Sequence, residues 1–277
     1  MYIKPKTKIN SYEFITVLGE GRYSVVYKVK GPNEEILAIK AISKNTNLFS
    51  HKYAENEMKI VKYLKPHKNL VTQLEQFEDD EGYYFVMEYI DGYSIKREVT
   101  ELIWRDSQSE LSLEMKKSII LQTIEGLKFL HKINIYHCDI KPDNIVLEGD
   151  SIKIVDFGCS FHSESKFVTF SKGVINSTPG VGPPEIIFTD PEVEVDLEKV
   201  DVWGVGYLIY YIFSGVVPFV SRNASETYLE VKNLKINYNP LPKNVTQICK
   251  SIFTNNLKLR LTLSELEELI IRLEDDN

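Results

Sequence analysis

Residues 136–147 bring together side chains that could transfer a phosphoryl group. Asp139, Lys141 and Asn144 lie within six residues of one another, and Asp156 follows as the first residue of an Asp-Phe-Gly triplet. Phosphoryl transfer needs a carboxylate that orients the attacking hydroxyl, a cation beside the transferred group, and carboxylate and amide oxygens for Mg²⁺. This set supplies each of these groups. The simpler alternative is a polar loop with a few acidic residues.

A glycine-rich turn occurs near the start of the chain and weakens that simpler alternative. The turn begins with Leu18, Gly19, Glu20 and Gly21. Glycine lets backbone amides approach phosphate oxygens closely. A plain hairpin turn is the competing interpretation, and Ser24 stands where a third glycine is usual. A dinucleotide-binding turn would lead into a helix, whereas strand-like residues follow here.

Lys40 closes an apolar segment, where a lysine is commonly an ordinary surface residue. A role in nucleotide binding requires a carboxylate that holds its ammonium group against the α- and β-phosphates. Glu57 and Glu55 both lie on a helix expected over residues 54–64. The apolar positions of this helix favour Glu57, because it lies beside them and could face inward.

The elements around these residues change in type along the chain. Runs of β-forming residues separated by turn residues predict strands over residues 14–18, 25–30, 36–42, 70–78 and 83–89. Helical spacing dominates later, over residues 112–131, 200–214 and 263–273. Ser112 is the expected N-cap of the first of these helices, and the second is apolar nearly all round and should be buried. This order predicts an α+β protein of two unequal lobes.

Composition places the chain among ordinary soluble globular proteins. Of the 277 residues, 43% are hydrophobic and 26% are charged, and the three cysteines need not pair. The sequence predicts no secretory leader and no membrane span, so we expect a cytoplasmic or nuclear protein that is not secreted. A formal net charge of −7 speaks against nucleic acid as a partner.

Taken in order, these motifs resemble those of the eukaryotic-type protein kinases over roughly residues 12–273. The resemblance implies a bilobal kinase fold, with a small β-rich N-lobe that carries one key helix and a larger, mainly helical C-lobe. The N-lobe would cover about residues 12–88 and the C-lobe about residues 92–273, with ATP in the cleft between them. Residues 1–11 would be a short extension and residues 274–277 a tail.

The resemblance also implies roles for the polar residues. Lys40 and Glu57 look like the phosphate-anchoring ion pair, Asp139 is similar to the catalytic base, and Lys141 is similar to the lysine that contacts the γ-phosphate. Asn144 and Asp156 correspond to the ligands of Mg²⁺, for which Mn²⁺ could substitute. Further matches concern the residues around adenine and the glycine-rich turn that would cover the phosphates of ATP. They are Leu18, Gly19, Glu20, Gly21, Val26, Ala38, Met87, Glu88, Ile90 and Val146. Among these, Met87 would be the gatekeeper, and Glu88 and Ile90 would offer backbone bonds to adenine.

Other matches concern the framework of the site. Asp201 resembles the residue that ties down the backbone of the catalytic loop, and Arg260 is placed to be the buried partner of Glu185. A packed column that reports the active state would consist of Val61, Leu74, His137 and Phe157.

The sequence departs from the family pattern at Cys138, where the family has an arginine that pairs with a phosphorylated residue. The usual phosphorylated position falls on Val174, which has no hydroxyl group. We therefore hypothesise that activity does not require phosphorylation of the activation loop. Thr178 and Pro179 match the serine/threonine kinase pattern, while the glycines of residues 180–183 replace the usual bulky aromatic.

Three other functions compete with a serine/threonine protein kinase. A pseudokinase scaffold is supported only by Ser24 and Cys138, and a small-molecule kinase should lack the Pro-Pro-Glu segment and Arg260. Tyrosine phosphorylation is a minor alternative. The expected partners are ATP, protein substrates and an activating protein, with the chain itself a monomer and no membrane partner. Cys159 is either a reactive thiol or, more simply, a small buried residue.

Overall fold

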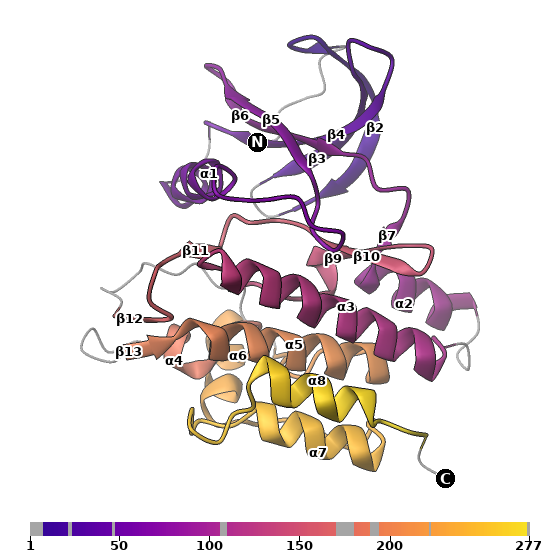
Figure 1. The fold of residues 1–277 in the computed structure, drawn as a ribbon, viewed down its shortest axis with the longest axis vertical. Coiled ribbons are helices and arrows are strands. Elements are labelled where there is room, and N and C mark those ends of the chain that lie inside the picture. Colours follow the sequence, from indigo (N-terminus) through magenta and orange to yellow (C-terminus); the bar gives the residue numbers. More distant parts are fainter. Residues whose placement is uncertain are drawn as a thin grey trace.

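The computed structural model describes residues 8–21, 24–45, 48–105, 110–169, 180–188, 194–221 and 223–275. Strands gather at one end of the molecule and helices at the other (Figure 1). This arrangement confirms the α+β fold of two unequal lobes, which are called here the N-lobe and the C-lobe.

The N-lobe contains an antiparallel sheet of six strands in the order β1-β2-β3-β4-β6-β5. Its strands are β1 (Lys8–Ile9), β2 (Tyr12–Glu20), β3 (Val25–Lys30), β4 (Ile36–Ser43), β5 (Gln73–Glu78) and β6 (Gly82–Glu88). The predicted strand over residues 70–78 begins three residues late. The reason is that Leu70 and Val71 pair with Ile154 of the C-lobe, where the N–H of Val71 donates to the Ile154 carbonyl at 3.0 Å.

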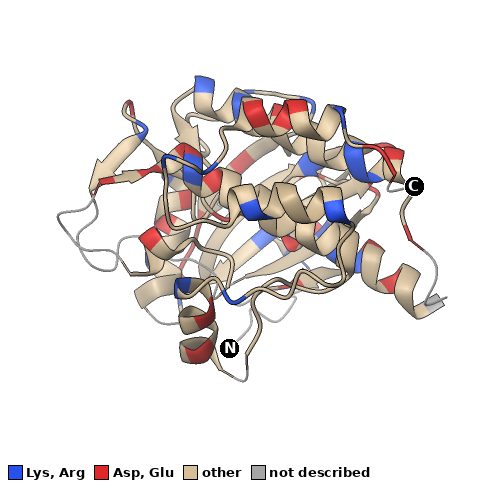
Figure 2. Cartoon of the chain, turned by 90° about the horizontal axis from the view of Figure 1, so that it is seen from below, with Lys and Arg blue, Asp and Glu red and all other residues tan. Residues whose placement is uncertain are grey.

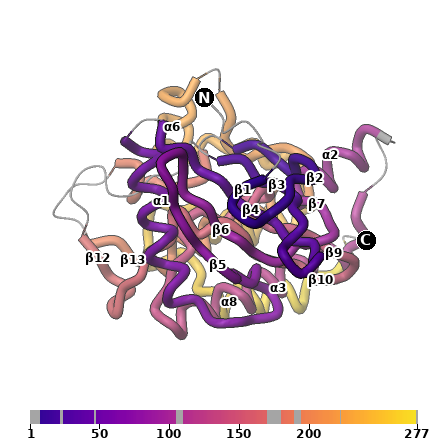
Figure 3. The backbone as a smooth tube through the Cα atoms, turned by 90° about the horizontal axis from the view of Figure 1, so that it is seen from above, coloured from indigo at the N-terminus to yellow at the C-terminus, as the bar shows by residue number. Residues whose placement is uncertain are grey.

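Helix α1 (Leu48–Ile60) lies beside this sheet, on the side where β12 and β13 also lie (Figure 3). It begins six residues earlier than the helix predicted over residues 54–64, and it ends four residues earlier than that prediction. The start was missed because Leu48 and Phe49 are exposed apolar residues that do not continue the buried stripe. The end comes early because residues 61–64 form turns, with Pro66 shortly beyond.

The C-lobe is built on helices. They are α2 (Ile95–Arg105), α3 (Leu113–Lys132), η1 (Pro142–Asn144), α4 (Pro184–Ile187), α5 (Leu197–Ser214), α6 (Ala224–Lys232), α7 (Lys243–Ile252) and α8 (Leu263–Ile271). As expected, Ser112 caps α3, where its hydroxyl accepts from the N–H of Met115 at 3.2 Å, and α5 is buried along most of its length. Helices α2, α6 and α7 were not predicted; each has at most eleven residues.

Short strands join the lobes and frame the catalytic loop. They form three small sheets: β7 (Tyr93–Ser94), β9 (Ile145–Glu148) and β10 (Ser151–Ile154); β8 (Ile135–Tyr136) and β11 (Phe161–His162); and β12 (Phe167–Thr169) and β13 (Glu194–Asp196). Asp139, Lys141 and Asn144 lie in the catalytic loop, which follows β8 and precedes β9. The loop is thus held at both of its ends by strand pairing.

One hydrophobic core runs through both lobes, from α1 and β6 into α3, α5 and α7, and a second cluster covers the other face of the N-lobe sheet. At the surface of the C-lobe the two signs of charge are interspersed along the helices (Figure 2). Lys128 of α3 and Glu267 of α8, for example, form an ion pair at 2.6 Å. Among the described residues, none of the helices is long and apolar enough to cross a membrane.

Candidate active site

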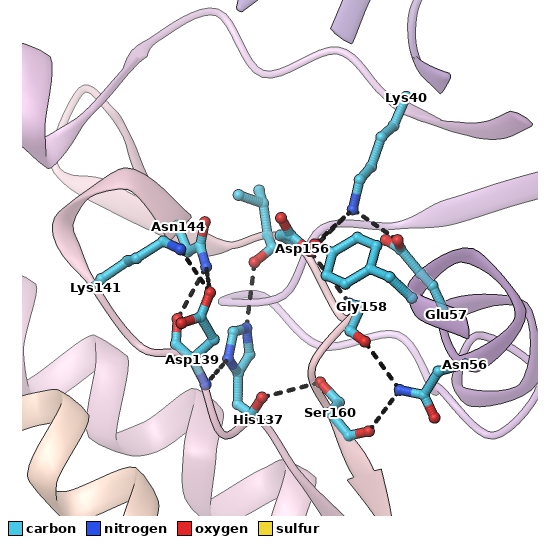
Figure 4. Close-up of polar contacts among 12 residues, drawn as sticks. Lys40, Asn56, Glu57, His137, Asp139, Lys141, Asn144, Asp156, Gly158 and Ser160 are labelled. Carbon is cyan, nitrogen blue, oxygen red and sulfur yellow. Dashed lines mark hydrogen bonds and ion pairs between the residues drawn. The ribbon is translucent and has the colours of Figure 1, made fainter. Parts of the chain in front are cut away.

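The catalytic loop places two polar side chains around one carboxylate (Figure 4). The Oδ2 atom of Asp139 accepts from the Lys141 ammonium at 2.6 Å and from the Asn144 amide at 3.2 Å. The same amide nitrogen donates to the Asp139 carbonyl at 2.9 Å. Although burial lowers the pKa of Lys141, the Asp139 carboxylate outweighs this effect and raises it, so the lysine stays charged. The loop therefore presents a carboxylate and a cation side by side.

A buried carboxylate on α5 holds the start of this loop. Asp201 accepts from the backbone N–H groups of His137 at 3.0 Å and Cys138 at 2.7 Å, and it contacts the His131 ring at 2.7 Å. Cys138 has a positive φ of 61°, which is unfavourable for a residue with a side chain. The bonds to Asp201 stabilise that conformation. The predicted role of Asp201 is confirmed.

Lys40 lies buried between two carboxylates. Its ammonium group is 2.6 Å from Glu57 and 2.9 Å from Asp156 (Figure 4). Glu57 is fully buried, whereas Glu55 is exposed, so the structure selects Glu57 as the partner. Burial opposes the charge on Lys40, but Asp156 and Glu57 together raise its pKa above the usual value. Burial also raises the pKa of Glu57 to about 7, against the opposing effect of Lys40.

Asp156 presents one occupied and one open oxygen. Its Oδ1 atom accepts from Lys40, from the Gly158 N–H at 3.2 Å and from the Tyr53 hydroxyl. No described residue donates to its Oδ2 atom or to the Oδ1 atom of Asn144. Burial disfavours the carboxylate, yet Lys40 lowers the pKa of Asp156 well below its usual range, so it remains ionised.

These two open oxygens fit a magnesium ion. Mg²⁺ prefers oxygen ligands and is usually held by one or two protein groups, with substrate phosphates and waters as the rest. In the described parts of the chain, no group of three or more histidine, cysteine, aspartate or glutamate side chains could hold a metal. Asn144 and Asp156 therefore suit a cation that arrives with phosphate better than a metal enclosed by protein.

The residues predicted to surround adenine come from both lobes. In the N-lobe sheet, Ala38 pairs with Met87, and Val26 on β3 is partly buried. Val146 lies on β9 of the small sheet at the top of the C-lobe, and Ile90 lies just after β6. Residues of two lobes could thus contact opposite faces of one flat ligand.

The segment after Met87 has one backbone group already in use. The N–H of Glu88 donates to the carbonyl of Thr72 at 3.0 Å. The side chain of Glu88 accepts from the N–H of Thr72 and from Lys153. Of the Glu88 backbone, only the carbonyl could therefore contact a base.

The glycine-rich turn is the end of a hairpin between β2 and β3. Leu18, Gly19 and Glu20 belong to β2, and the N–H of Gly21 donates to the carbonyl of Ser24 at 2.7 Å. Apart from the neighbours of Gly19 in the chain, no atom of the described residues lies within 4 Å of the position that a Gly19 Cβ would occupy, which leaves room for a ligand beside this backbone.

The predicted packed column is wrong at one of its positions. His137 and Phe157 are buried with ring centroids 5.6 Å apart, and Val61 is partly buried. Leu74 is 54% exposed. It lies at a bulge in the pairing of β5 with β6, which disturbs the alternation of side chains between the two faces.

Arg260 and Glu185 form the expected ion pair. The guanidinium group is 2.5 and 3.1 Å from the two carboxylate oxygens, and it also donates to the carbonyls of Lys199 and Thr254. Arg260 is almost completely buried. This pair joins the start of α4 to the segment before α8.

Several predictions concern residues outside the described part of the chain. They are those on Ser171, Val174, Ser177, Thr178 and Pro179. Nearby, Gly180 has a φ of 85°, and a side chain there would meet the carbonyl of Phe219 at 3.1 Å. For Cys159, burial and the carboxylates of Asp139 and Asp156 raise the pKa of the thiol well above its usual value, which favours the simpler interpretation of an unreactive residue.

Two residues of the site were missed from the sequence. Tyr53 bonds to Asp156, and the Asn56 amide donates to the carbonyls of Gly158 at 3.0 Å and Ser160 at 2.9 Å. Tyr53 lies one helical turn before Glu57, so the helical period could have indicated it. It was overlooked because the predicted helix began at residue 54.

Comparisons with known proteins agree with this geometry. The family model "Protein kinase domain" matches residues 12–269. The chain is 30% identical to CBL-interacting serine/threonine-protein kinase 19 of Arabidopsis thaliana, over 80% of this chain and 45% of the relative. It is 27% identical to Aurora kinase C of Mus musculus, over 93% of this chain and 90% of the relative. The chain spans about half the length of the CBL-interacting relatives that it matches.

Proposed function

Because the chain belongs to the protein kinase family, we propose that it transfers the γ-phosphoryl group of ATP to serine and threonine hydroxyls of proteins. One observation carries the proposal: the ion pair of Lys40 and Glu57 is closed and reaches Asp156, within one site that also holds Asp139, Lys141 and Asn144. Matches to relatives named as serine/threonine kinases support the choice of hydroxyl. The catalytic domain would cover residues 12–273, within a protein that is cytoplasmic.

In this mechanism Asp139 is the catalytic base. Its carboxylate accepts the hydrogen bond of the substrate hydroxyl and takes its proton as the hydroxyl oxygen bonds to the γ-phosphorus and the bond from that phosphorus to the departing ADP oxygen breaks. Lys141, already bonded to Asp139, stabilises the negative charge that develops on the transferred group. Lys40 anchors the α- and β-phosphates and is itself held by Glu57.

Asn144 and Asp156 would hold Mg²⁺, or Mn²⁺ in its place, through the two open oxygens. The cation supplies electrostatic stabilisation of the phosphate charges during transfer. Lys40 keeps Asp156 ionised and therefore ready to bind it. The residues around adenine orient the nucleotide, with Val26 and Ala38 on one side and Val146 on the other.

We further propose that phosphorylation of the activation loop is not required. Cys138 is buried, and its burial and the nearby Asp201 raise the pKa of the thiol well above its usual value. The residue therefore carries no charge and cannot pair with a phosphate. Several similar proteins are named CBL-interacting kinases. By analogy, a protein partner would be the other route to control of this chain.

The proposal is tested by Mg²⁺-dependent transfer of labelled phosphate from ATP to a library of serine and threonine peptides. We expect transfer by the wild-type protein and a loss of about 10³-fold or more in rate with Asp139→Asn. This variant lacks the catalytic base and the negative charge that pairs with Lys141. Folded protein that binds ATP but transfers no phosphate, alone or with a candidate partner, would favour the scaffold alternative. Phosphate found on tyrosine peptides would change the proposed substrate class.

A further inference from the structure

Tyr53 of α1 touches each part of the charged centre. Its hydroxyl donates to the Oδ1 atom of Asp156 and accepts from the Lys40 ammonium at 3.3 Å. The Lys40 nitrogen also lies 4.8 Å from the centre of the Tyr53 ring. Tyr53 is buried and lies one turn before Glu57 on the same helix face. One face of α1 therefore carries both the partner of Lys40 and a donor to Asp156.

The Tyr53 ring also packs against the backbone that follows Asp156. A Cβ atom on Gly158 would come within 2.0 Å of the ring. Only a glycine therefore leaves room for the ring at this place. The phenol is held by packing as well as by its hydrogen bonds, so it can fix the orientation of the Asp156 carboxylate.

Asn56 makes a second link between α1 and this backbone. Its amide nitrogen donates to the carbonyls of both Gly158 and Ser160 (Figure 4). Ser160 is fully buried, and its hydroxyl donates to the carbonyl of His137 at 3.3 Å. A chain of neutral hydrogen bonds therefore leads from α1 through residues 158–160 to the catalytic loop.

We propose that Tyr53 and Asn56 form a clamp, called here the α1 clamp, that positions Asp156 for its metal ion and holds residues 156–160 without any phosphate group. The role of Asp156 as a metal ligand rests on the proposed function, whereas the hold of the clamp on residues 156–160 does not. Tyr53, Lys40 and the Gly158 N–H all bond to the Oδ1 atom of Asp156, which leaves Oδ2 for the cation. The uncharged Cys138 cannot draw this segment into place through a phosphate, whereas the two α1 side chains do so directly.

Hydrogen–deuterium exchange tests the clamp without catalysis. We expect Asn56→Ala to raise exchange about tenfold or more in peptides that cover residues 157–161, since two hydrogen bonds to that backbone are lost. The matched control is Asn69→Ala, because the Asn69 amide donates to Gln122 and to the Ile152 carbonyl in the C-lobe. Unchanged exchange at residues 157–161 in Asn56→Ala, or an equal rise in Asn69→Ala, would overturn the clamp.

The same peptides test whether the clamp is independent of phosphate. Wild-type protein treated with a phosphatase should keep its protection at residues 157–161. A loss of protection after that treatment would contradict the proposal, because the segment would then depend on a phosphorylated residue.

The dependence of the rate on Mg²⁺ tests the role of Tyr53. Tyr53→Phe keeps the ring and removes only the hydroxyl group. We expect kcat to fall about tenfold, the effect of losing one hydrogen bond to a charged group, and the Mg²⁺ concentration for half-maximal rate to rise severalfold. Tyr210→Phe is the control, since this buried tyrosine donates to the carbonyl of Asn237 in the C-lobe.

A fall in thermal stability with unchanged Mg²⁺ dependence would reduce Tyr53 to a structural residue and overturn its positioning role. A faster Tyr53→Phe variant would also overturn it, because the phenol would then restrain Asp156 from its metal ion. If the wild-type protein transfers no phosphate, alone or with a candidate partner, the proposed function fails. In that case the affinity for ATP is measured with and without Mg²⁺ for the wild-type protein and for Tyr53→Phe. The difference between these two proteins in their dependence on Mg²⁺ then decides the role of Tyr53.

Discussion

The two halves of the active site are held in different ways. The C-lobe half is anchored by buried charged groups, namely Asp201 beneath the start of the catalytic loop and the Arg260–Glu185 pair between α4 and the segment before α8. Residues 156–160 face the N-lobe and are attached to α1 by the neutral side chains of Tyr53 and Asn56, beside the ion pair of Lys40.

This difference has a physical consequence. Breaking a buried charged anchor leaves a desolvated group without a partner, so such an anchor gives a rigid part of the protein. A neutral hydrogen bond contributes less and is lost more easily. The C-lobe half should therefore be permanent, while the neutral bonds from Asn56 of α1 to residues 158 and 160 should be the weaker links and the ones open to regulation.

The comparison is tested most severely at Asp201. We expect Asp201→Ala to lower the free energy of unfolding by about 3 kcal/mol or more, because buried N–H groups lose their acceptor. Phosphoryl transfer should fall about 100-fold or more as the catalytic loop loses its position. Urea denaturation and the transfer assay measure both effects. Exposed Asp150 provides the control substitution, and an Asp201→Ala protein of wild-type stability would contradict the anchor.

Arg260→Lys tests the second charged anchor. The lysine keeps the charge but loses the paired donors that reach Glu185, so we expect a loss of about 2 kcal/mol in the free energy of unfolding. Arg272→Lys is the matched control, because Arg272 is exposed and pairs with Glu268 on the surface. Equal losses in the two variants would show that burial of the Arg260 pair does not matter.

Cys159 reports on the segment held by α1. Because burial and two carboxylates raise the pKa of its thiol, the reactive thiolate should be scarce at neutral pH and increase only as the pH rises above the usual thiol range. We expect alkylation by iodoacetamide at pH 7 to be about tenfold or more slower in the folded protein than in urea. Mass spectrometry identifies the modified residue. Fast labelling of folded protein would mean that the segment opens readily.

The smallest effect is expected in the activation loop. If the α1 clamp replaces a phosphate, Ser171→Ala combined with Ser177→Ala, with Thr178 kept, should leave the transfer rate within about twofold of wild type. The same assay with peptide substrates measures it. A collapse of activity would mean that a loop hydroxyl is needed, which would remove the distinction between the two halves.

Much of the site could be predicted because its signals are local. Strand β3 was predicted at its observed bounds, since turn residues flank a strongly β-forming run. The choice of Glu57 over Glu55 followed from the apolar pattern of one helix, and the structure agrees with it. Leu74 was wrongly placed, because a bulge shifts the pairing of its strand and no pattern in the strand itself indicates a bulge.

The sequence by itself determined the type of chemistry and the family, because the order and spacing of Lys40, Asp139, Asn144 and Asp156 can be read along the chain. The tertiary structure alone decided how Asp156 is held. Tyr53 and Asp156 are 103 positions apart, and Asn56 is 104 positions from Ser160. Contacts between such distant segments depend on how α1 packs against the C-lobe, and neither segment carries a local pattern that reports on the other.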